Sequence, residues 1–298
     1  MASEAAGALP AVPAHPAAAT AGLHARILRR RIARVAINAV IFLFALFPIL
    51  WGLSSSLKPT DRIIEFPPQL LPDEVTLEHY VRIFQDDAAF YILNSGLVSA
   101  ATVALTLTLA ALGGYALARY DFRGRTAAMM AIVAVMSIPI ASLLVPTFTL
   151  ISVLGLFDTR LGLVLLYTAY QLPAAIWMLY GYFMSLPVEV ENAARVDGCT
   201  PLATLRKVVL PLSKPGLVAA ALFILVFAWN DFVVAVTMTS SEATRTFPVA
   251  IYFYLGFYGR EWGPLLAASL ISIVPIIAVF VFLQRYFMSG LTGGGVKG

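Results

Sequence analysis

Charged residues are scarce in this chain of 298 residues. Asp, Glu, Lys and Arg make up 12% of it, against about a quarter in typical soluble domains. Hydrophobic residues make up 60%, and the mean hydropathy is +0.86. This combination excludes an ordinary soluble fold. The length leaves room for six membrane spans of about 20 residues each, with loops between them.

Cysteine and histidine are almost absent. The single Cys199 excludes a disulfide within the chain. His15, His24 and His79 lie outside the apolar runs, and no His-Glu-x-x-His motif occurs. Asp231 lies well inside an apolar run and has no acidic partner in these runs. Because intramembrane hydrolysis needs a nucleophile with a base, a metal or paired carboxylates, we expect no catalytic residue and no metal site.

A phosphate-binding loop is also missing. The glycine-rich segment at residues 290–298 lacks a Ser or Thr after Lys297, and it follows an apolar run rather than a strand. We therefore expect no cofactor on this chain. For a membrane protein of this kind, we also expect no nucleic-acid partner. If ATP drives its activity, a separate subunit must bind ATP with Mg²⁺.

Six long apolar runs dominate what is present. The first follows Arg34 and ends near Leu53. The others lie at about 90–118, 126–150, 161–184, 214–238 and 263–284. Prolines interrupt several runs, which helix bundles tolerate. We predict an all-α polytopic membrane protein with six transmembrane helices over residues 33–287. Residues 1–32 are predicted to be a disordered, basic segment.

Lysine and arginine fall unevenly among the loops. If the N-terminus is cytoplasmic, fourteen of the 20 Lys and Arg residues lie inside, including the cluster at residues 26–34, and six lie outside. The positive-inside rule then places both termini in the cytoplasm. The polar loop at residues 186–212 is cytoplasmic in this topology, and residues 58–89 are external.

The loop at residues 186–212 is longer than a connection between spans requires. Pro187 suits the first turn of a short helix, and Asp197–Gly198 supplies a turn. Thr200–Val209 reads as a second short helix, which Pro211 interrupts. The simplest interpretation is a solvated connection. The alternative is a docking element for another protein.

The same loop resembles the EAA loop of ABC importer permeases. The matching residues are Ala193, Ala194, Gly198, Val208, Leu210 and Pro211. The family's Glu falls on Asn192, which removes a charge that could pair with an ATPase arginine. Glu191 also belongs to this loop, but it points about 100° away from Asn192 on a helix and cannot simply replace that charge. The resemblance implies that the loop, with Asp197 among its contact or shaping residues, docks on an ATPase.

The resemblance extends from about residue 33 to the end of the chain. Further matching segments are Ser56–Pro59, Tyr115–Arg119, Trp229–Phe232 and Gly294–Gly298. Together they are similar to the shorter, six-span partner in carbohydrate-uptake permeases of the maltose type. This implies the type I ABC importer fold with cytoplasmic coupling helices, in a prokaryotic inner membrane. The implied partners are a second, different permease, an ATPase dimer and an extracytoplasmic solute-binding protein.

The C-terminal tail at residues 288–298 has two interpretations. Glycine-rich ends are usually frayed. The resemblance implies instead that Gly294, Gly295, Val296 and Lys297 reach toward the ATPase subunits.

Polar and aromatic residues within the spans are candidates for the solute path. They are Tyr167, Tyr170, Gln171, Trp229, Asn230 and Asp231. For Asp231, capping a break in the helix or pairing with a neighbouring helix is an equally good interpretation. Aromatic residues near span ends are also common as membrane-interface anchors.

Other classes of protein fit less well. An ion-driven secondary transporter has no need of a docking loop. An amino-acid or peptide permease shares the loop but not the other matching segments. Within the carbohydrate group, related permeases also carry polyols and glycerol phosphates, so the solute itself stays open.

Overall fold

The structure, a computed structural model, describes the backbone of residues 17–256 and 260–293 and the side chains of residues 29–256 and 260–284. The chain divides into two compact units, residues 1–52 and residues 53–298. The described elements are helical: α1 (Ala17–Ser56), η1 (Thr60–Arg62), α2 (Glu78–Gln85), α3 (Ala88–Arg119), α4 (Arg125–Met136), α5 (Ile140–Val153), α6 (Arg160–Met184), α7 (Val188–Val196), α8 (Pro201–Thr204), η2 (Leu205–Val209), α9 (Leu210–Leu212), α10 (Lys214–Asn230), α11 (Val233–Met238), α12 (Phe247–Phe253) and α13 (Trp262–Gly293).

The first unit contains almost all of α1. Its segment Arg29–Ser56 has a mean hydropathy of 2.3 and buries none of its most apolar stretch in the protein. An apolar helix of 28 residues with exposed side chains is suited to lipid contact. Because α1 begins at Ala17, the prediction of disorder over residues 1–32 is wrong for residues 17–32, whose Ala and Arg residues favour a helix.

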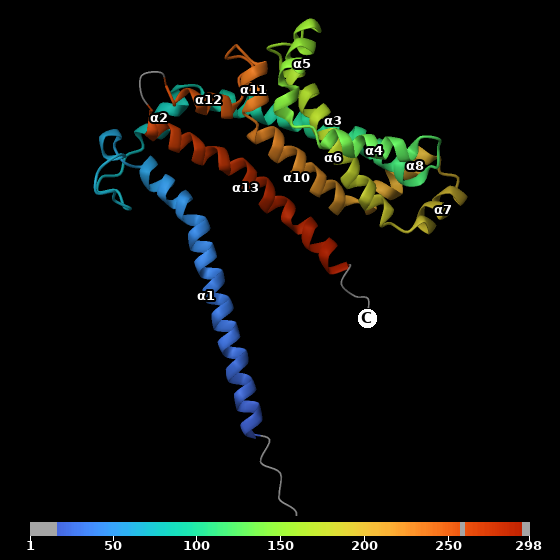
Figure 1. Cartoon of the computed structure of the whole chain (residues 1–298), viewed down its shortest axis with the longest axis horizontal. Coiled ribbons are helices and arrows are strands. Elements are labelled where there is room, and N and C mark those ends of the chain that lie inside the picture. Colours follow the sequence, from blue (N-terminus) through green and yellow to red (C-terminus); the bar gives the residue numbers. More distant parts are fainter. Residues whose placement is uncertain (1–16, 257–259, 294–298) are drawn as a thin grey trace, which may run out of the picture. The chain divides into compact units, whose positions relative to one another are not determined.

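The second unit is built around α3. This helix packs most extensively against α6 and also against α10, and α10 in turn packs against α13. Figure 1 shows these four helices side by side, with α2 and α12 toward one end and α7 at the other. The close approach of α3 to α6 depends on Gly114, since an added Cβ would lie 3.1 Å from the backbone nitrogen of Tyr180.

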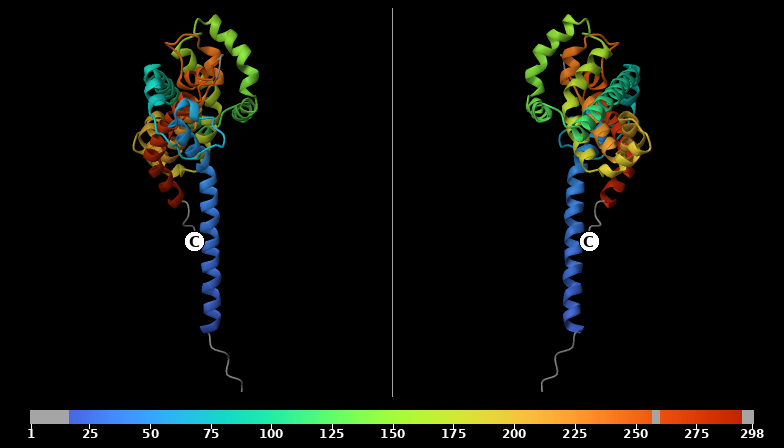
Figure 2. Two further views of the ribbon diagram at one scale, coloured as in Figure 1. Left: turned by 90° about the vertical axis from the view of Figure 1, so that its left-hand side faces the viewer. Right: turned by 90° about the vertical axis from the view of Figure 1, so that its right-hand side faces the viewer.

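Two of the predicted spans are broken, the one at residues 126–150 and the one at residues 214–238, which α10 and α11 share. The segment 126–150 is divided into α4 and α5, which meet at an angle of 100°. Figure 2 shows the two green helices at this bend. Pro139 precedes α5 in an extended conformation, which ends the helical path of α4. Among the described residues, four helices are long and apolar enough to cross a membrane, or up to six if each bent pair counts as one span.

The second short helix of the polar loop is not regular. It consists of α8, one turn of π-helix at η2, and α9. Pro211 follows this turn; it has no N–H to donate, and its ring would clash with the carbonyl four residues earlier. The wider π turn relieves that conflict. The chain then turns by 83° into α10.

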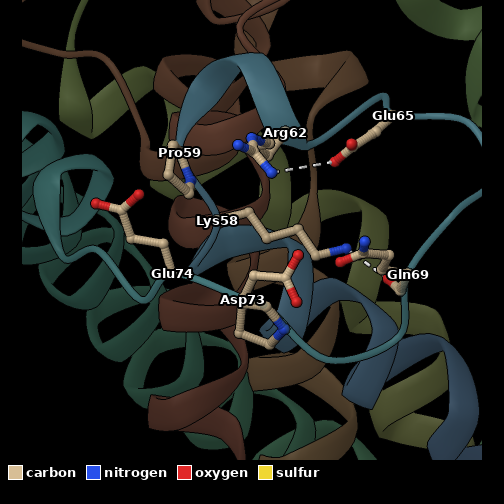
Figure 3. A pocket seen from close by; sticks show the side chains of 8 residues that line it. Lys58, Pro59, Arg62, Glu65, Gln69, Asp73 and Glu74 are labelled. Atoms are coloured by element: carbon tan, nitrogen blue, oxygen red, sulfur yellow. Dashed lines mark hydrogen bonds and ion pairs between the residues drawn. The ribbon is translucent and has the colours of Figure 1, made fainter.

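The segment after α1 forms a polar pocket of about 230 Å³. Lys58 is buried there, and its Nζ donates a hydrogen bond to the carbonyl oxygen of Gln69 at 2.5 Å. Figure 3 shows Arg62 directed toward Glu65, with 3.9 Å between Nη1 and Oε2. These contacts fold the segment back on itself.

Two other connections at the α2 end are joined through Asp158. Its Oδ1 accepts hydrogen bonds from the backbone N–H groups of Ser240 (2.9 Å) and Ser241 (3.1 Å) and from the hydroxyl of Thr244. Desolvation raises the pKa of Asp158, but these hydrogen bonds outweigh it and lower that pKa to about 2. The α5–α6 connection is thereby fixed to the α11–α12 connection.

The C-terminal helix is longer than predicted. Because α13 extends to Gly293, residues 288–293 are helical and do not belong to an irregular tail. The predicted ATPase-contacting residues at 294–297 lie outside the described part of the chain.

We predict that Gly114→Ala lowers the free energy of unfolding by about 1–3 kcal/mol, because α6 presents backbone atoms that must move aside. Gly96→Ala in the same helix is the matched control. No heavy atom lies within 4 Å of its added Cβ, and we expect a change between zero and a gain of about 1 kcal/mol. Thermal unfolding in detergent compares the two. Equal stability of both variants would contradict the close packing of α3 on α6.

Candidate functional site

The polar loop presents one well-formed helix, α7. Pro187 is its N-cap, one position before the expected first turn. The helix ends in a Schellman motif: the N–H of Cys199 donates to Ala194 and the N–H of Gly198 donates to Arg195, both at 3.0 Å. Gly198 has φ of +83°, which glycine adopts without strain. The predicted turn at Asp197–Gly198 is therefore confirmed.

The inner face of α7 carries a buried charge. Glu191 is 2% exposed, and its Oε1 lies 2.7 Å from Nε of Arg119 at the end of α3. Its other oxygen, Oε2, accepts a hydrogen bond from the hydroxyl of Tyr115 at 2.9 Å. One helical turn separates Tyr115 from Arg119, so both reach the same carboxylate.

Arg119 has further partners on a third helix. Its Nη2 donates to the carbonyl oxygens of Phe183 (2.7 Å) and Leu186 (3.3 Å), at and just after the end of α6. The Phe183 carbonyl also accepts from the N–H of Leu186 at 3.1 Å, so Arg119 binds the turn that ends α6. One guanidinium therefore joins the ends of α3 and α6 to α7.

This geometry shows how Glu191 lies within the predicted coupling loop. The residue was predicted to belong to the ATPase-coupling loop, but its carboxylate is turned into the protein and paired with Arg119. It is therefore not available as a surface contact. Tyr115 and Arg119 were not predicted to contact this loop. Two features of the sequence could have indicated this contact. Arg119 lies in the last turn of a predicted span, and Glu191 lies on the same face of its helix as Ala194.

The outer face of α7 and the start of α8 are exposed. Asn192, Ala193 and Asp197 lie on the surface, whereas Ala194 is buried. The most exposed large apolar side chains here are Val196, 87% exposed, and Leu202, 64% exposed. We call the exposed residues Asn192, Ala193, Val196 and Leu202 the docking face. Farther along, Leu210 is half-buried and Pro211 is exposed.

Asp231 stands at the break in the fifth predicted span. The helix α10 ends at Asn230, and Asp231 is extended. Its Oδ2 accepts hydrogen bonds from the N–H groups of Val234 (3.1 Å) and Ala235 (3.0 Å) at the start of α11, and from the hydroxyl of Tyr167 at 3.0 Å. Asp231 therefore caps α11 and links it to α6, as one of the two interpretations of this residue proposed.

The other solute-path candidates do not form one surface. Tyr167 and Trp229 are buried in the protein, and Nε1 of Trp229 donates to the carbonyl oxygen of Ser272 at 3.0 Å. Gln171 is buried, and Tyr170 is half-buried with its hydroxyl 3.0 Å from that of Thr147. The side chains of Tyr167, Gln171 and Trp229 lie in the core of this structure, and their role in the solute path stays a prediction.

Asn230 differs from these candidates in being exposed. It borders a cavity of about 260 Å³ between α10, α12 and α13, together with Ser269 and Ser272. A role in the solute path stays a prediction for Asn230. Among the described residues, no group of three or more His, Cys, Asp or Glu side chains is placed to hold a metal ion.

The fold is that of an ABC importer transmembrane subunit. A chain in the crystal structure of a bacterial ABC transporter involved in the import of the acidic polysaccharide alginate aligns with a TM-score of 0.74 and 26% identity, over 88% of this chain and 97% of that one. A chain of the methionine ABC transporter MetNI, at 17% identity, aligns with a TM-score of 0.54 and shares the fold. The predicted all-α type I fold is confirmed.

The chain belongs to the family described as binding-protein-dependent transport system inner membrane component, which matches residues 110–292. That stretch contains α7 and the whole polar loop. The expected resemblance to ABC importer permeases is thereby confirmed, and with it the placement in a membrane.

Several curated relatives cover most of the chain. A sulfoquinovosyl glycerol transport system permease protein from Agrobacterium fabrum is 37% identical over 87% of this chain and 92% of its own length. A trehalose transport system permease protein from Mycobacterium tuberculosis is 37% identical over 88% of this chain and 96% of its own length. A trehalose/maltose transport system permease protein from Thermococcus litoralis is 33% identical over 88% of this chain and 95% of its own length.

The capping role of Asp231 leads to a prediction. Asp231→Ala removes the cap of α11 and leaves the Tyr167 hydroxyl without its acceptor, so we expect a loss of about 1–3 kcal/mol in the free energy of unfolding. Tyr167→Phe removes one hydrogen bond and leaves the cap, so its loss should be smaller. Thermal unfolding in detergent compares these variants. An unchanged stability of Asp231→Ala would contradict the structural assignment.

Proposed function

We propose that this chain is a permease subunit of a binding-protein-dependent ABC importer for a carbohydrate. In this proposal it forms half of the translocation path with a second, different permease. Two copies of a separate ATPase drive the transport. The observation that carries the proposal is the docking loop itself: a capped helix with an exposed outer face, held firmly to the membrane helices by its inner face.

The docking face suits contact with an ATPase through apolar side chains. Val196 and Leu202 are large apolar residues that this chain leaves exposed on its polar loop. Asn192 stands where the family has a charged Glu, and Glu191 is engaged with Arg119. The expected contact is therefore dominated by apolar burial, with Asn192 as a neutral hydrogen-bonding group.

Carbohydrate is the solute class that the relatives favour. The names of three curated relatives specify sulfoquinovosyl glycerol, trehalose, and trehalose or maltose. One solved structure concerns import of alginate, an acidic polysaccharide. Because these relatives cover nearly the full chain, a sugar, oligosaccharide or polyol is a better proposal for this chain than an amino acid or a peptide.

The orientation follows from the charges of the loops. The α7 end carries Arg119, Arg195, Arg206 and Lys207, and the positive-inside rule assigns it to the cytoplasm, where ATP is available. The α2 end then faces the solute-binding protein. Both termini are cytoplasmic in this arrangement.

The proposal is tested by purifying the tagged chain with its co-expressed candidate ATPase, second permease and binding protein. We expect an ATPase to co-purify, and its turnover to rise when the binding protein is loaded with one member of a sugar panel. Methionine and glycerol phosphate serve as non-sugar comparisons. Uptake that follows a proton or sodium gradient without ATP would contradict the proposal and favour a secondary transporter.

A matched pair of variants makes the test specific to the docking face. Val196→Arg places a charge at an 87%-exposed position on that face, and Leu71→Arg does so at a 76%-exposed position in the external segment. Loss of an apolar anchor is expected to reduce ATPase retention by about tenfold or more. Leu71→Arg should retain the ATPase as well as the wild type does. Equal retention by both variants would show that the ATPase binds elsewhere.

A further inference from the structure

Three helix ends meet at one guanidinium. Arg119 is the last residue of α3, Phe183 lies in the last turn of α6, and Glu191 lies in α7. The Arg119 side chain is 5% exposed and that of Glu191 is 2% exposed. No other element of the polar loop has an ion pair with the membrane helices among the described residues.

The hydrogen bonds of this cluster are divided among separate elements. Nε of Arg119 serves Glu191 on α7, and its Nη2 serves the carbonyls of Phe183 and Leu186 at the end of α6. Tyr115 occupies the second oxygen of Glu191. A rotation of α7 away from α3 would break both hydrogen bonds of Glu191 and leave its charge and that of Arg119 unpaired in a dry environment, while Arg119 would still hold α3 to the end of α6.

The same two membrane helices have the most extensive mutual packing in the chain. The cluster under α7, with Tyr115, Leu179 and Phe183, continues into the α3–α6 interface. Gly114 and the backbone of Tyr180 form a tight point of that interface, little more than one turn from Arg119. A displacement applied at α7 therefore reaches α3 and α6 as a pair.

We propose that Arg119 and Glu191 are positioning residues that make α7, α3 and α6 move as one rigid body, so that this pair transmits ATPase motion into the membrane. The inference rests on the proposed function, since it needs an ATPase on the docking face. A pair that only stabilises the fold would be replaceable by apolar residues of similar size. A pair that transmits motion would not, because apolar contacts lack the directional bonds that fix the angle of α7.

The decisive comparison uses single and double replacements in the assembled importer. Arg119→Met and Glu191→Met each leave a buried charge without its partner, and we expect each to lower the unfolding temperature by about 5 °C or more. The double variant Arg119→Met/Glu191→Met removes both charges and should regain most of that temperature. In the importer assembled with this double variant, loaded binding protein should nevertheless no longer stimulate the ATPase subunits. The ratio of stimulated to basal ATP turnover should fall to about one.

A distance measurement reports the rigid body directly. Spin labels are placed at Val188 on α7 and Leu97 on α3, which are 44% and 59% exposed, after Cys199→Ser removes the native thiol. With Arg119 and Glu191 present, we expect a narrow distance distribution that shifts as a whole when ATP binds. In the double variant we expect a broader distribution with a smaller shift.

Two further variants complete the design. Tyr115→Phe removes one hydrogen bond and leaves the ion pair, so stimulation and the distance distribution should stay near wild type. Glu191→Gln keeps the size but removes the charge and one of the two acceptor oxygens that Arg119 and Tyr115 use, so it weakens the directional bonds of α7 and takes the place of the double variant if that variant does not fold. It should reduce stimulation and broaden the distribution.

Unchanged coupling would overturn the inference. If the double variant, or Glu191→Gln in its place, is stimulated as strongly as the wild type with an unchanged distance distribution, the pair is only structural. Failure of the proposed function looks different, since then no ATPase would be retained or stimulated by the wild-type chain.

Discussion

A buried ion pair is stable only where the protein replaces the water that both charges have lost, and the pair of Arg119 and Glu191 meets this condition through hydrogen bonds from Tyr115 and to the end of α6. The polar loop takes its orientation from this constraint. Because Glu191 is fixed inward, Asn192 and Val196 are fixed outward. The α-helical geometry of α7 then decides which residues a partner protein meets.

The remainder of the second unit is arranged around helix breaks that polar groups stabilise. Asp231 supplies the cap that lets α11 begin after the break at the end of α10. The π turn before Pro211 precedes the 83° bend between the docking loop and α10. Asp158 holds the connections at the opposite end. The helices thus have fixed ends at both sides of the bundle, which a subunit needs if a push at one end is to reach the other.

Local sequence signals predicted part of this arrangement well. The apolar runs located the long helices, because a membrane span requires a long apolar segment. Gly198 marked the end of α7, because its positive φ is a backbone conformation that glycine adopts without strain. The division of two runs was missed, since hydropathy does not register a break in the helix at Pro139 or Asp231. The burial of individual polar side chains was the least predictable property of the structure.

Contacts between distant parts of the chain explain those misses. Arg119 and Glu191 are separated by 72 residues, and Tyr167 and Asp231 by 64. In the sequence each is a polar group near or within a span, which is equally typical of a solute site and of an internal partner. The structure supplies the exposure and the hydrogen bonds of each residue, which the sequence does not contain. It leaves Asn230 on a surface and places Tyr167 and Trp229 in the core.

The most direct measurement of the central claim uses the native Cys199, which lies half-buried in the docking loop and is the only cysteine of the chain. A membrane-impermeant maleimide is applied to right-side-out and inside-out membrane vesicles, with and without the co-assembled ATPase. The account predicts labelling only in inside-out vesicles, and protection from labelling when the ATPase is present. Labelling from the outer side, or labelling from the inner side that the ATPase does not reduce, would contradict a cytoplasmic docking loop that couples this chain to ATP hydrolysis.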